Sequence, residues 1–111
     1  MARTPNRPDL ISLRLFLTVI EESSITRAAA REHITAPAVS KRLSELEAQL
    51  GVQLFERHSG GVRPTAAGRA LEADARALFA TLERMQTLAG DYASGARGEV
   101  RLYANASSIV D

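Results

Sequence analysis

Apolar side chains recur at helical spacing near the start of the chain. Four of them stand at positions i, i+3, i+4 and i+7 of one another: Leu13, Phe16, Leu17 and Ile20. This spacing places all four on one face of an α-helix. Asp9 precedes the segment, and its short carboxylate side chain is suited to cap the first free amides of a helix. The pattern therefore predicts a helix over residues 9–22 with one buried face.

A second, shorter helix is predicted after Ser24, which can cap its first turn. Ile25, Ala28 and Ala29 share a face of this helix, and the small alanine side chains permit a close crossing with a neighbour. The chain must then turn within a few residues, and no glycine stands in this turn. His33 belongs to the residue types that tolerate a positive φ there.

The third predicted helix begins at Ala36, with Thr35 as its cap. Pro37 suits the first turn, because the amide that proline lacks would have no partner inside the helix. Gly51 ends the helix. A narrow apolar sector is formed by Val39, Leu43, Leu46 and Leu50. The opposite side carries Pro37, Lys41, Ser44 and Ala48, with Ser40 on one flank.

A short β-hairpin is predicted after the third helix. Val52, Leu54 and Val62 are apolar positions on the two sides of a polar turn that contains residues 59–61. Thr65 follows the hairpin as the expected cap of another helix.

The segment over residues 65–93 is helical in composition and much longer than the others. Six of its positions are spaced 4, 3, 4, 3 and 4 residues apart: Leu71, Ala75, Leu78, Leu82, Met85 and Ala89. This is the a/d pattern of a coiled coil. The helix can pack back on the three-helix core, or its seam can meet a second chain. We favour the second interpretation, because a helix rises about 1.5 Å per residue and its later turns would extend past a compact core.

The two ends of the chain differ in character from the rest. Residues 1–8 contain prolines and arginines and are expected to form a flexible arm. Residues 94–111 open with serine and glycine, and then alternate Val100 and Leu102 with Arg101 and Tyr103, as a strand does. A lone strand is not stable in water. We therefore interpret this segment as a hinge and the first strand of a truncated further domain.

Composition limits the compartment and the chemistry. The chain of 111 residues is 45% apolar and 24% charged, has a formal net charge of +1 and contains no cysteine. A disulfide framework and a thiolate metal site are therefore excluded. The longest apolar run is far shorter than the roughly 20 residues of a membrane span, and the N-terminus does not lead into a secretory signal. We expect a soluble, cytoplasmic protein.

Three short helices with a tight turn between the second and third, followed by a hairpin, are typical of a winged helix-turn-helix. The expected fold is thus mostly α, with a long dimerisation helix after the hairpin wing. In this architecture the third helix enters the major groove of DNA. Its N-terminus offers amides to phosphate and Lys41 adds charge, while Ser40 and Ser44 are short enough to approach base edges. A small excess of Lys and Arg over Asp and Glu in residues 1–64 fits this interpretation.

Several motifs stand at fixed spacing along residues 13–71. They are S-I-T-R-A-A at residues 24–29, P-A-V-S-K-R-L-x-x-L-E at residues 37–47, L-F-E-R at residues 54–57 and T-A-A-G at residues 65–68, with Phe16 and Glu21 ahead of them. In these motifs and their spacing the chain resembles the N-terminal segment of LysR-type transcriptional regulators. The resemblance implies a winged helix-turn-helix over residues 9–64 and a linker helix over residues 65–93 that pairs antiparallel with a second chain. It also implies a following effector-binding domain in the full-length protein.

Carried over by position, the base-reading residues of the family fall on Ala36, Pro37, Ser40 and Lys41. Ala36 stands where the family often has a glutamine. A methyl group can contact only the methyl of a thymine, whereas glutamine can form two hydrogen bonds to adenine. We therefore expect an altered preference at that base pair rather than a loss of binding.

The wing contact of the family falls near Gly60, where a basic residue is frequent. The cations that remain in the wing are Arg57, His58 and Arg63, and the sequence leaves open which of them contacts phosphate. The complete set of candidate DNA-binding residues is Thr35, Ala36, Pro37, Ser40, Lys41, Ser44, Arg57, His58 and Arg63.

The predicted function is a transcriptional regulator that binds an interrupted palindrome in double-stranded DNA as a homodimer, with a tetramer as a further assembly of the full-length protein. No cofactor or metal is expected in this segment, and a small-molecule inducer is expected for the full-length protein. An alternative is a winged helix that contacts only proteins, although the third helix lacks the aromatic anchors of protein hot spots. An enzyme is not expected, because no nucleophile elbow and no phosphate-binding glycine loop is present.

Overall fold

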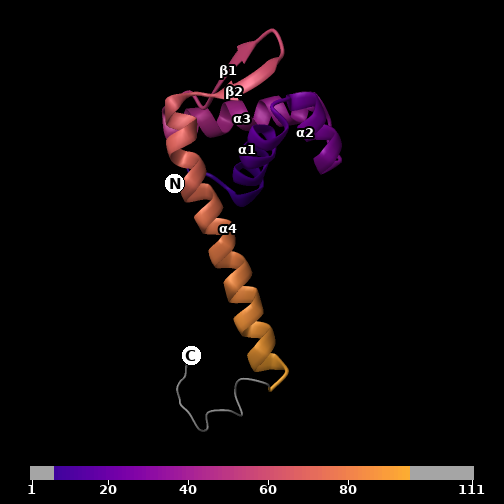
Figure 1. Cartoon of the computed structure of the whole chain (residues 1–111), viewed down its shortest axis with the longest axis vertical. Helices are drawn as coiled ribbons and strands as arrows, with labels where there is room; N and C mark the ends of the chain where they lie inside the picture. The colour runs from indigo at the N-terminus through magenta and orange to yellow at the C-terminus, as the bar shows by residue number, and fades with distance from the viewer. Residues whose placement is uncertain (1–6, 96–111) are drawn as a thin grey trace, which may run out of the picture. The chain divides into compact units, whose positions relative to one another are not determined.

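The computed structural model of the protein describes residues 7–95 (Figure 1). The elements follow the order α1, α2, α3, β1, β2 and α4. The chain divides into two compact units, residues 1–76 and residues 77–111. The strand predicted around Val100 and most of the predicted N-terminal arm lie outside the described residues.

Three helices open the first unit: α1 (Leu10–Glu22), α2 (Ile25–Glu32) and α3 (Ala36–Leu50). Each begins after a side-chain oxygen that accepts a backbone N–H three residues later. The three contacts are Asp9 with Ser12 at 2.7 Å, Ser24 with Arg27 at 3.1 Å and Thr35 with Ala38 at 3.2 Å. The predicted caps are confirmed, and they fix where each helix starts.

Both connections between these helices pass through a non-glycine residue in the left-handed region. His33 follows α2 with a φ of 62°, as its residue type allows. Ser23 follows α1 with a φ of 56°, which the sequence does not predict, and its N–H donates to the carbonyl of Val19 at 2.8 Å. The left-handed residue lets each chain segment reverse within two or three residues, and this gives α2 and α3 their tight connection.

The core of the first unit lies where α1, α2 and α3 meet the start of the hairpin. Its largest fully buried side chains are Phe16, Val19, Val39, Leu46 and Leu54. The ring of Phe16 contacts the ring of Phe55 edge to face, with centroids 5.7 Å apart and an interplanar angle of 66°. The predicted apolar sector of α3 is therefore packed inward, and the opposite side of this helix is left at the surface.

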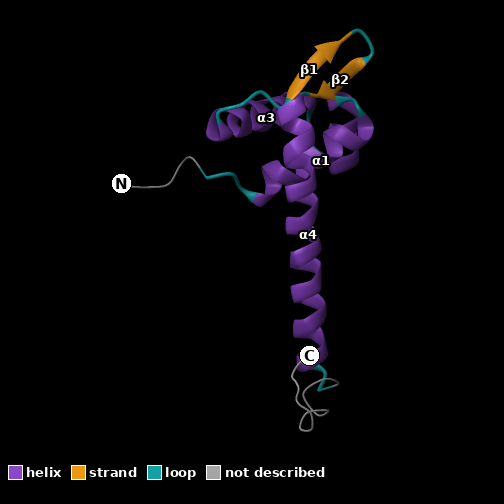
Figure 2. Cartoon of the chain, turned by 60° about the vertical axis from the view of Figure 1, so that its left-hand side comes forward, coloured by secondary structure: helices purple, strands orange, loops and turns teal. Residues whose placement is uncertain are grey.

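Two short strands, β1 (Phe55–His58) and β2 (Gly61–Pro64), pair antiparallel as a hairpin (Figure 2). His58 pairs with Gly61, so Ser59 and Gly60 alone form the turn. The hairpin is confirmed. However, Val52 does not belong to it: the chain reverses after Gly51, which has a φ of 75°, and Val52 lies exposed in this reversal.

The hairpin is attached to the turn between α1 and α2. The N–H of Val62 donates to the carbonyl of Ser23 at 3.2 Å. A Cβ at Gly61 would lie 2.3 Å from the Ser23 oxygen, and the φ of Gly61 is +141°. Only glycine fits this position without a shift of the backbone.

The long helix α4 (Ala66–Ala93) begins in the first unit. Thr65 caps it as predicted, since its Oγ1 accepts the N–H of Gly68 at 3.0 Å. The same hydroxyl donates to the carbonyl of Gln53 at 2.6 Å. A Cβ at Gly68 would lie 2.4 Å from the carbonyl oxygen of Leu54, so glycine permits this close approach between the first turn of α4 and the segment before β1.

The described part of the second unit consists of the remainder of α4 and the turn that follows it. Leu78, Met85 and Tyr92 are large apolar residues of this part, and all three are exposed. Along residues 7–95, no helix combines the length with the apolar character that crossing a membrane requires.

Candidate nucleic-acid interface

The outward side of α3 carries most of the DNA-binding candidates that the sequence places on this helix. Val39, Leu43 and Leu46 are buried on the inward side. Pro37, Lys41 and Ser44 are exposed on the other side, whereas Ser40 is half-buried on its flank and Ala36 is half-buried at the N-terminal end. The side chains on this face are small and polar apart from one lysine, so the backbone of α3 can approach a partner closely.

The same face includes the N-terminal end of α3. The first amides of a helix have no acceptor within it, and they give this end a partial positive charge. Thr35 accepts the N–H of Ala38, and Pro37 has no N–H to satisfy. An anion such as a phosphate is therefore favoured near this end of the helix.

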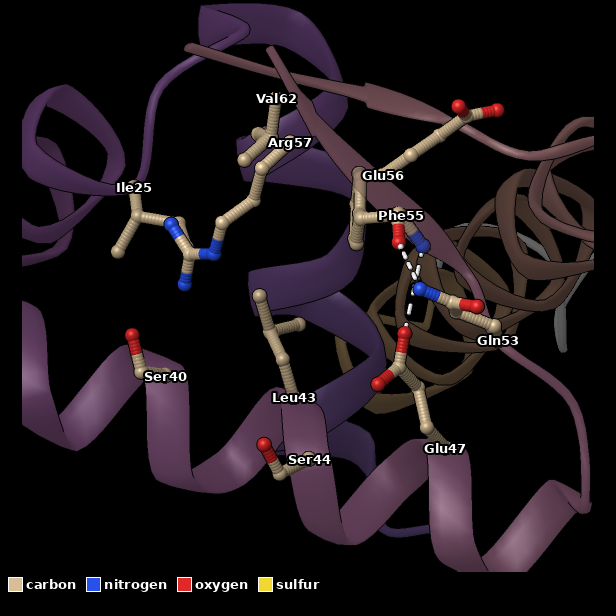
Figure 3. Close-up of a pocket in the computed structure, with 10 residues that line it drawn as sticks. All are labelled: Ile25, Ser40, Leu43, Ser44, Glu47, Gln53, Phe55, Glu56, Arg57 and Val62. Carbon is tan, nitrogen blue, oxygen red and sulfur yellow. Dashed lines mark hydrogen bonds between the residues drawn. The ribbon is translucent and has the colours of Figure 1, made fainter.

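The hairpin directs its side chains to two faces. Side chains alternate along a strand, so Phe55 and Arg57 point to one side and Glu56 and His58 to the other. Phe55 is in the core, and Val62, which pairs with Arg57, is buried. Arg57 therefore lies on the inner face of the hairpin, toward α3 (Figure 3).

A groove of about 390 Å³ runs between the hairpin and α3. It is lined by Ser40, Ser44 and Glu47 of α3, by Ile25 at the start of α2, and by hairpin residues that include Arg57. Figure 3 shows the guanidinium of Arg57 extending across this groove toward Ile25 and Ser40. The fold thus places the cation of Arg57 beside the polar face of α3.

The other two hairpin candidates lie elsewhere. Arg63 is exposed and pairs in register with Glu56, on the face of the hairpin that points away from Val62. His58 is exposed near the turn, and its Nδ1 accepts the N–H of Gly60 at 3.1 Å. The structure therefore separates the three hairpin candidates and brings Arg57 alone next to α3.

Ion pairs distinguish the cations of residues 7–95 from one another. In this part of the chain, six arginines contact a carboxylate: Arg14, Arg27, Arg31, Arg42, Arg69 and Arg76. Over residues 7–95, the side chains of Lys41, Arg57 and Arg63 take part in no ion pair or hydrogen bond. These three DNA-binding candidates can therefore meet phosphate without first leaving a carboxylate.

The largest group of ion pairs joins α1 and α2 to the start of α4. Glu21 contacts Arg31 at 2.7 Å and Arg76 at 3.1 Å; Arg31 also contacts Glu22 at 3.2 Å, and Arg76 contacts Glu72 at 3.0 Å. The hydrogen bond from Arg76, followed by that from Arg31, lowers the pKa of Glu21, and the Glu21 carboxylate raises the pKa of both arginines. These ion pairs connect α1 to both α2 and α4.

Three polar residues that line the groove are absent from the DNA-binding candidates: Glu47, Gln53 and Glu56. Glu47 has a structural role: its Oε2 accepts the N–H groups of Leu54 at 2.7 Å and Phe55 at 3.3 Å. Gln53, to which the sequence assigns no role, donates from Nε2 to the carbonyl of Phe55 at 3.1 Å. No sequence signal identifies these partners, because they depend on how the chain folds back after α3.

The six candidate dimer-interface residues of α4 differ in exposure. Leu78, Met85 and Ala89 are exposed, Leu71 and Leu82 are half-buried, and Ala75 is only 5% exposed within its own chain. Ala75 therefore offers little surface to a partner, and the apolar surface of the seam is concentrated from Leu78 onward.

The bacterial regulatory helix-turn-helix proteins of the lysR family match this chain over residues 10–69, from the start of α1 into the first turn of α4. Among relatives, an uncharacterized HTH-type transcriptional regulator in the ibpB-leuC intergenic region of Azotobacter vinelandii is 49% identical over 75 residues, which is 68% of this chain and 52% of that protein. The HTH-type transcriptional regulator XapR of Escherichia coli K12 is 41% identical over 96 residues, which is 86% of this chain and 33% of XapR. This chain thus spans about half of the first relative and a third of the second.

Similar solved structures include complexes with DNA. The BenM DNA-binding domain in complex with catB site 1 DNA has 37% identity and a TM-score of 0.75, covering 78% of this chain and 94% of that one. Full-length CbnR complexed with its target DNA has 34% identity and a TM-score of 0.70, covering 75% of this chain and 29% of that one. The match over residues 10–69 shows that the chain belongs to the LysR family of bacterial regulatory proteins, and its first unit has their DNA-binding winged helix-turn-helix fold.

Proposed function

We propose that this protein regulates transcription by binding an interrupted palindrome in double-stranded operator DNA as a homodimer. One observation carries the proposal: the polar face of α3 and the unpaired cations Lys41 and Arg57 form one surface. Lys41 and Arg57 supply attraction to phosphate, and Ala36, Pro37 and Ser40 discriminate between base pairs. The similarity to a BenM domain that was solved with DNA supports this assignment.

The dimer contact is proposed to lie on α4, where Leu78 and Met85 are exposed apolar residues. Antiparallel pairing of two such helices relates the two DNA-binding surfaces by a two-fold axis, and a palindromic operator has the same symmetry. A tetramer and a small-molecule inducer belong to the same proposal for the full-length protein. The site of action is the bacterial cytoplasm, and the function is binding without a catalytic step.

Selection from random double-stranded DNA tests the function directly. The chain is incubated with the pool at about 0.15 M salt, near the physiological ionic strength, and the bound duplexes are sequenced. We expect two half-sites in inverted orientation, and an affinity that falls linearly with salt on logarithmic axes. A chain that enriches no sequence and binds DNA without a salt dependence would instead be a protein-interaction module.

The variant Lys41→Ala tests the role of α3 in this function. We expect the salt dependence to lose about one unit of slope, and the affinity to fall by about 1–3 kcal/mol if the ammonium also contacts a base. Arg84→Ala, which removes the same charge from the second unit, serves as the control. A titration of Lys41→Ala that coincides with wild type would remove Lys41 from the interface.

A further inference from the structure

The connection between α3 and β1 is fastened to α3 by a single carboxylate. Glu47 lies in the last turn of α3, and its Oε2 accepts the N–H of Leu54 at 2.7 Å. The same oxygen accepts the N–H of Phe55 at 3.3 Å (Figure 3). Leu54 shows no exposed surface and Phe55 is 8% exposed. An unpaired amide at a buried position is costly, and a carboxylate is a stronger acceptor than a neutral group. The two hydrogen bonds of Glu47 therefore fix the start of the hairpin next to α3.

Fixing Phe55 also fixes Arg57. The two residues are separated by one position in the same short strand, so their side chains leave the same face of the hairpin. Both line the groove, together with Glu47 and Ser40. Glu47 stands seven residues after Ser40 on α3, which is two helical turns or about 10 Å along the axis. Glu47 thus holds the hairpin near one end of the groove, and Arg57 extends over Ser40 toward the other.

We infer that Glu47 is a positioning residue for DNA binding: by accepting the amides of Leu54 and Phe55 it holds the hairpin against α3, so that Arg57 meets DNA together with Ser40 and Lys41. The inference rests on the proposed function, because it concerns the same surface. Glu47 itself contacts no DNA in this scheme. Its effect on binding passes through the position of Arg57.

The expected sign of the effect separates positioning from simple electrostatics. Glu47 is an anion on the helix that approaches DNA, so removing its charge alone would strengthen binding to a polyanion. Loss of the hold on the hairpin would weaken binding instead. Glu45 provides a matched control, since it is exposed on the same helix and takes part in no ion pair or hydrogen bond among residues 7–95.

The experiment compares five forms of the chain: wild type, Glu45→Ala, Glu47→Ala, Arg57→Ala and the double variant of Glu47 and Arg57. The probe is the duplex obtained by selection with the wild-type chain, and Kd is measured by fluorescence anisotropy over a series of salt concentrations. We expect Arg57→Ala to lose about one unit of salt slope and about tenfold in affinity. Glu47→Ala should show the same loss, and Glu45→Ala should bind as tightly as wild type or more tightly.

The double variant distinguishes positioning from a general loss of structure. If Glu47 acts through Arg57, removing both residues should weaken binding no more than removing Arg57 alone, because residues that act as a unit are not additive. Independent, additive losses would overturn the inference. Wild-type or tighter binding by Glu47→Ala would overturn it as well.

The variant Glu47→Gln keeps the test decisive if Glu47→Ala fails to fold. Its amide oxygen can still accept one of the two N–H groups, but more weakly than a carboxylate. We expect a folded protein whose affinity and salt slope lie between those of wild type and Arg57→Ala. Faster exchange of the Leu54 and Phe55 amides without any change in DNA binding would overturn the inference while leaving the proposed function intact. A wild-type chain that does not bind DNA would instead refute the proposed function itself.

Discussion

Single atoms decide how closely the segment before the hairpin and the start of α4 can approach each other. The carbonyl oxygen of Leu54 accepts the N–H of Thr65 at 2.9 Å, and the same oxygen faces the bare Cα of Gly68. The hydroxyl of Thr65 donates a hydrogen bond to the carbonyl of Gln53 at 2.6 Å. The segment that carries Leu54 is thus held by Glu47 of α3 and by the cap of α4, and the carbonyl oxygen of Leu54 leaves no room for an added carbon at Gly68.

Replacing Gly68 by alanine should therefore destabilise the first unit. The new Cβ would lie 2.4 Å from a backbone oxygen and 3.2 Å from the Cβ of Pro64, and neither atom is the end of a flexible side chain. Overpacking of this kind destabilises a protein by about 1–3 kcal/mol. The higher helix propensity of alanine offsets about 1 kcal/mol of this loss. We expect a lower free energy of unfolding in urea denaturation.

Gly90→Ala is the matched control in the same helix. Nothing lies within 4 Å of a Cβ at this position, so only the gain in helix propensity applies. Helical content by circular dichroism should be unchanged or higher for Gly90→Ala. An unfolding free energy of Gly68→Ala equal to that of wild type would show that α4 and Leu54 do not approach as closely as the structure has them.

At the scale of elements, the third turn of α4 is connected to α1 and α2 through charge. Glu21 near the end of α1 contacts Arg31 of α2 and Arg76 of α4, and its side chain is 36% exposed. Water screens a pair this exposed, and isolated exposed pairs stabilise a protein by about 0.2–1 kcal/mol. The cluster therefore aligns helices more than it stabilises the fold.

The alignment by Glu21 should depend on pH. The hydrogen bonds from Arg76 and then Arg31 lower the pKa of Glu21 from its ordinary value of 4.5. A carboxyl with a lowered pKa contributes stability that is fully present above its unfolded pKa and disappears as the pH falls through the folded one. Glu21→Gln should therefore lower the melting temperature near pH 7, by no more than the equivalent of about 1 kcal/mol, and the difference from wild type should shrink below pH 4.5.

Melting curves of both forms between pH 3 and pH 7, a range of about four units that spans the ordinary carboxyl pKa, check this expectation. Glu83→Gln on α4 is the control, since Glu83 takes part in no ion pair over the described residues. A difference between Glu21→Gln and wild type that stays constant across this range would show that the Glu21 ion pairs do not contribute.

The beginnings of the helices could be predicted because they depend on local chemistry. Asp9, Ser24, Thr35 and Thr65 each accept an amide three residues later, so the signal and its partner lie within one turn of chain. The outward face of α3 follows from its apolar sector in the same way. These local rules were enough to place Lys41 on the exposed side of α3 and the half-buried Ser40 on its flank.

Contacts between distant parts of the chain could not be predicted from such rules. The hold of Glu47 on Leu54, the bond from Val62 to the carbonyl of Ser23 and the close approach at Gly68 all depend on how the elements meet. The face of the hairpin on which Arg57 lies depends on the exact start of β1, which the sequence places too early. A shift of one residue in a strand exchanges its two faces, so the sequence could not choose between Arg57 and Arg63.

At the scale of the whole molecule, net charge contributes little to an encounter with DNA. The formal net charge is only +1, so long-range attraction is weak and binding depends on the few cations that are free at the right place. Two copies joined through α4 would double these contacts. Once one half-site is occupied, the second contact becomes intramolecular and its effective concentration rises. We therefore expect operator affinity to depend strongly on dimerisation.

A charge on the proposed seam should both separate the two chains and weaken their binding to operator DNA. Leu78 is a large apolar residue with 39% of its surface exposed, and a carboxylate there would be desolvated in an apolar interface. We expect Leu78→Glu to be a monomer by multi-angle light scattering and to bind the selected operator at least about tenfold more weakly, because each half-site is then bound independently. Ala80→Glu adds the same charge two residues away, off the apolar seam and at an exposed position, and should stay dimeric. If Leu78→Glu also stays dimeric, the two copies meet through a different surface. The affinity for a single half-site duplex would then show whether the first unit binds DNA without that seam.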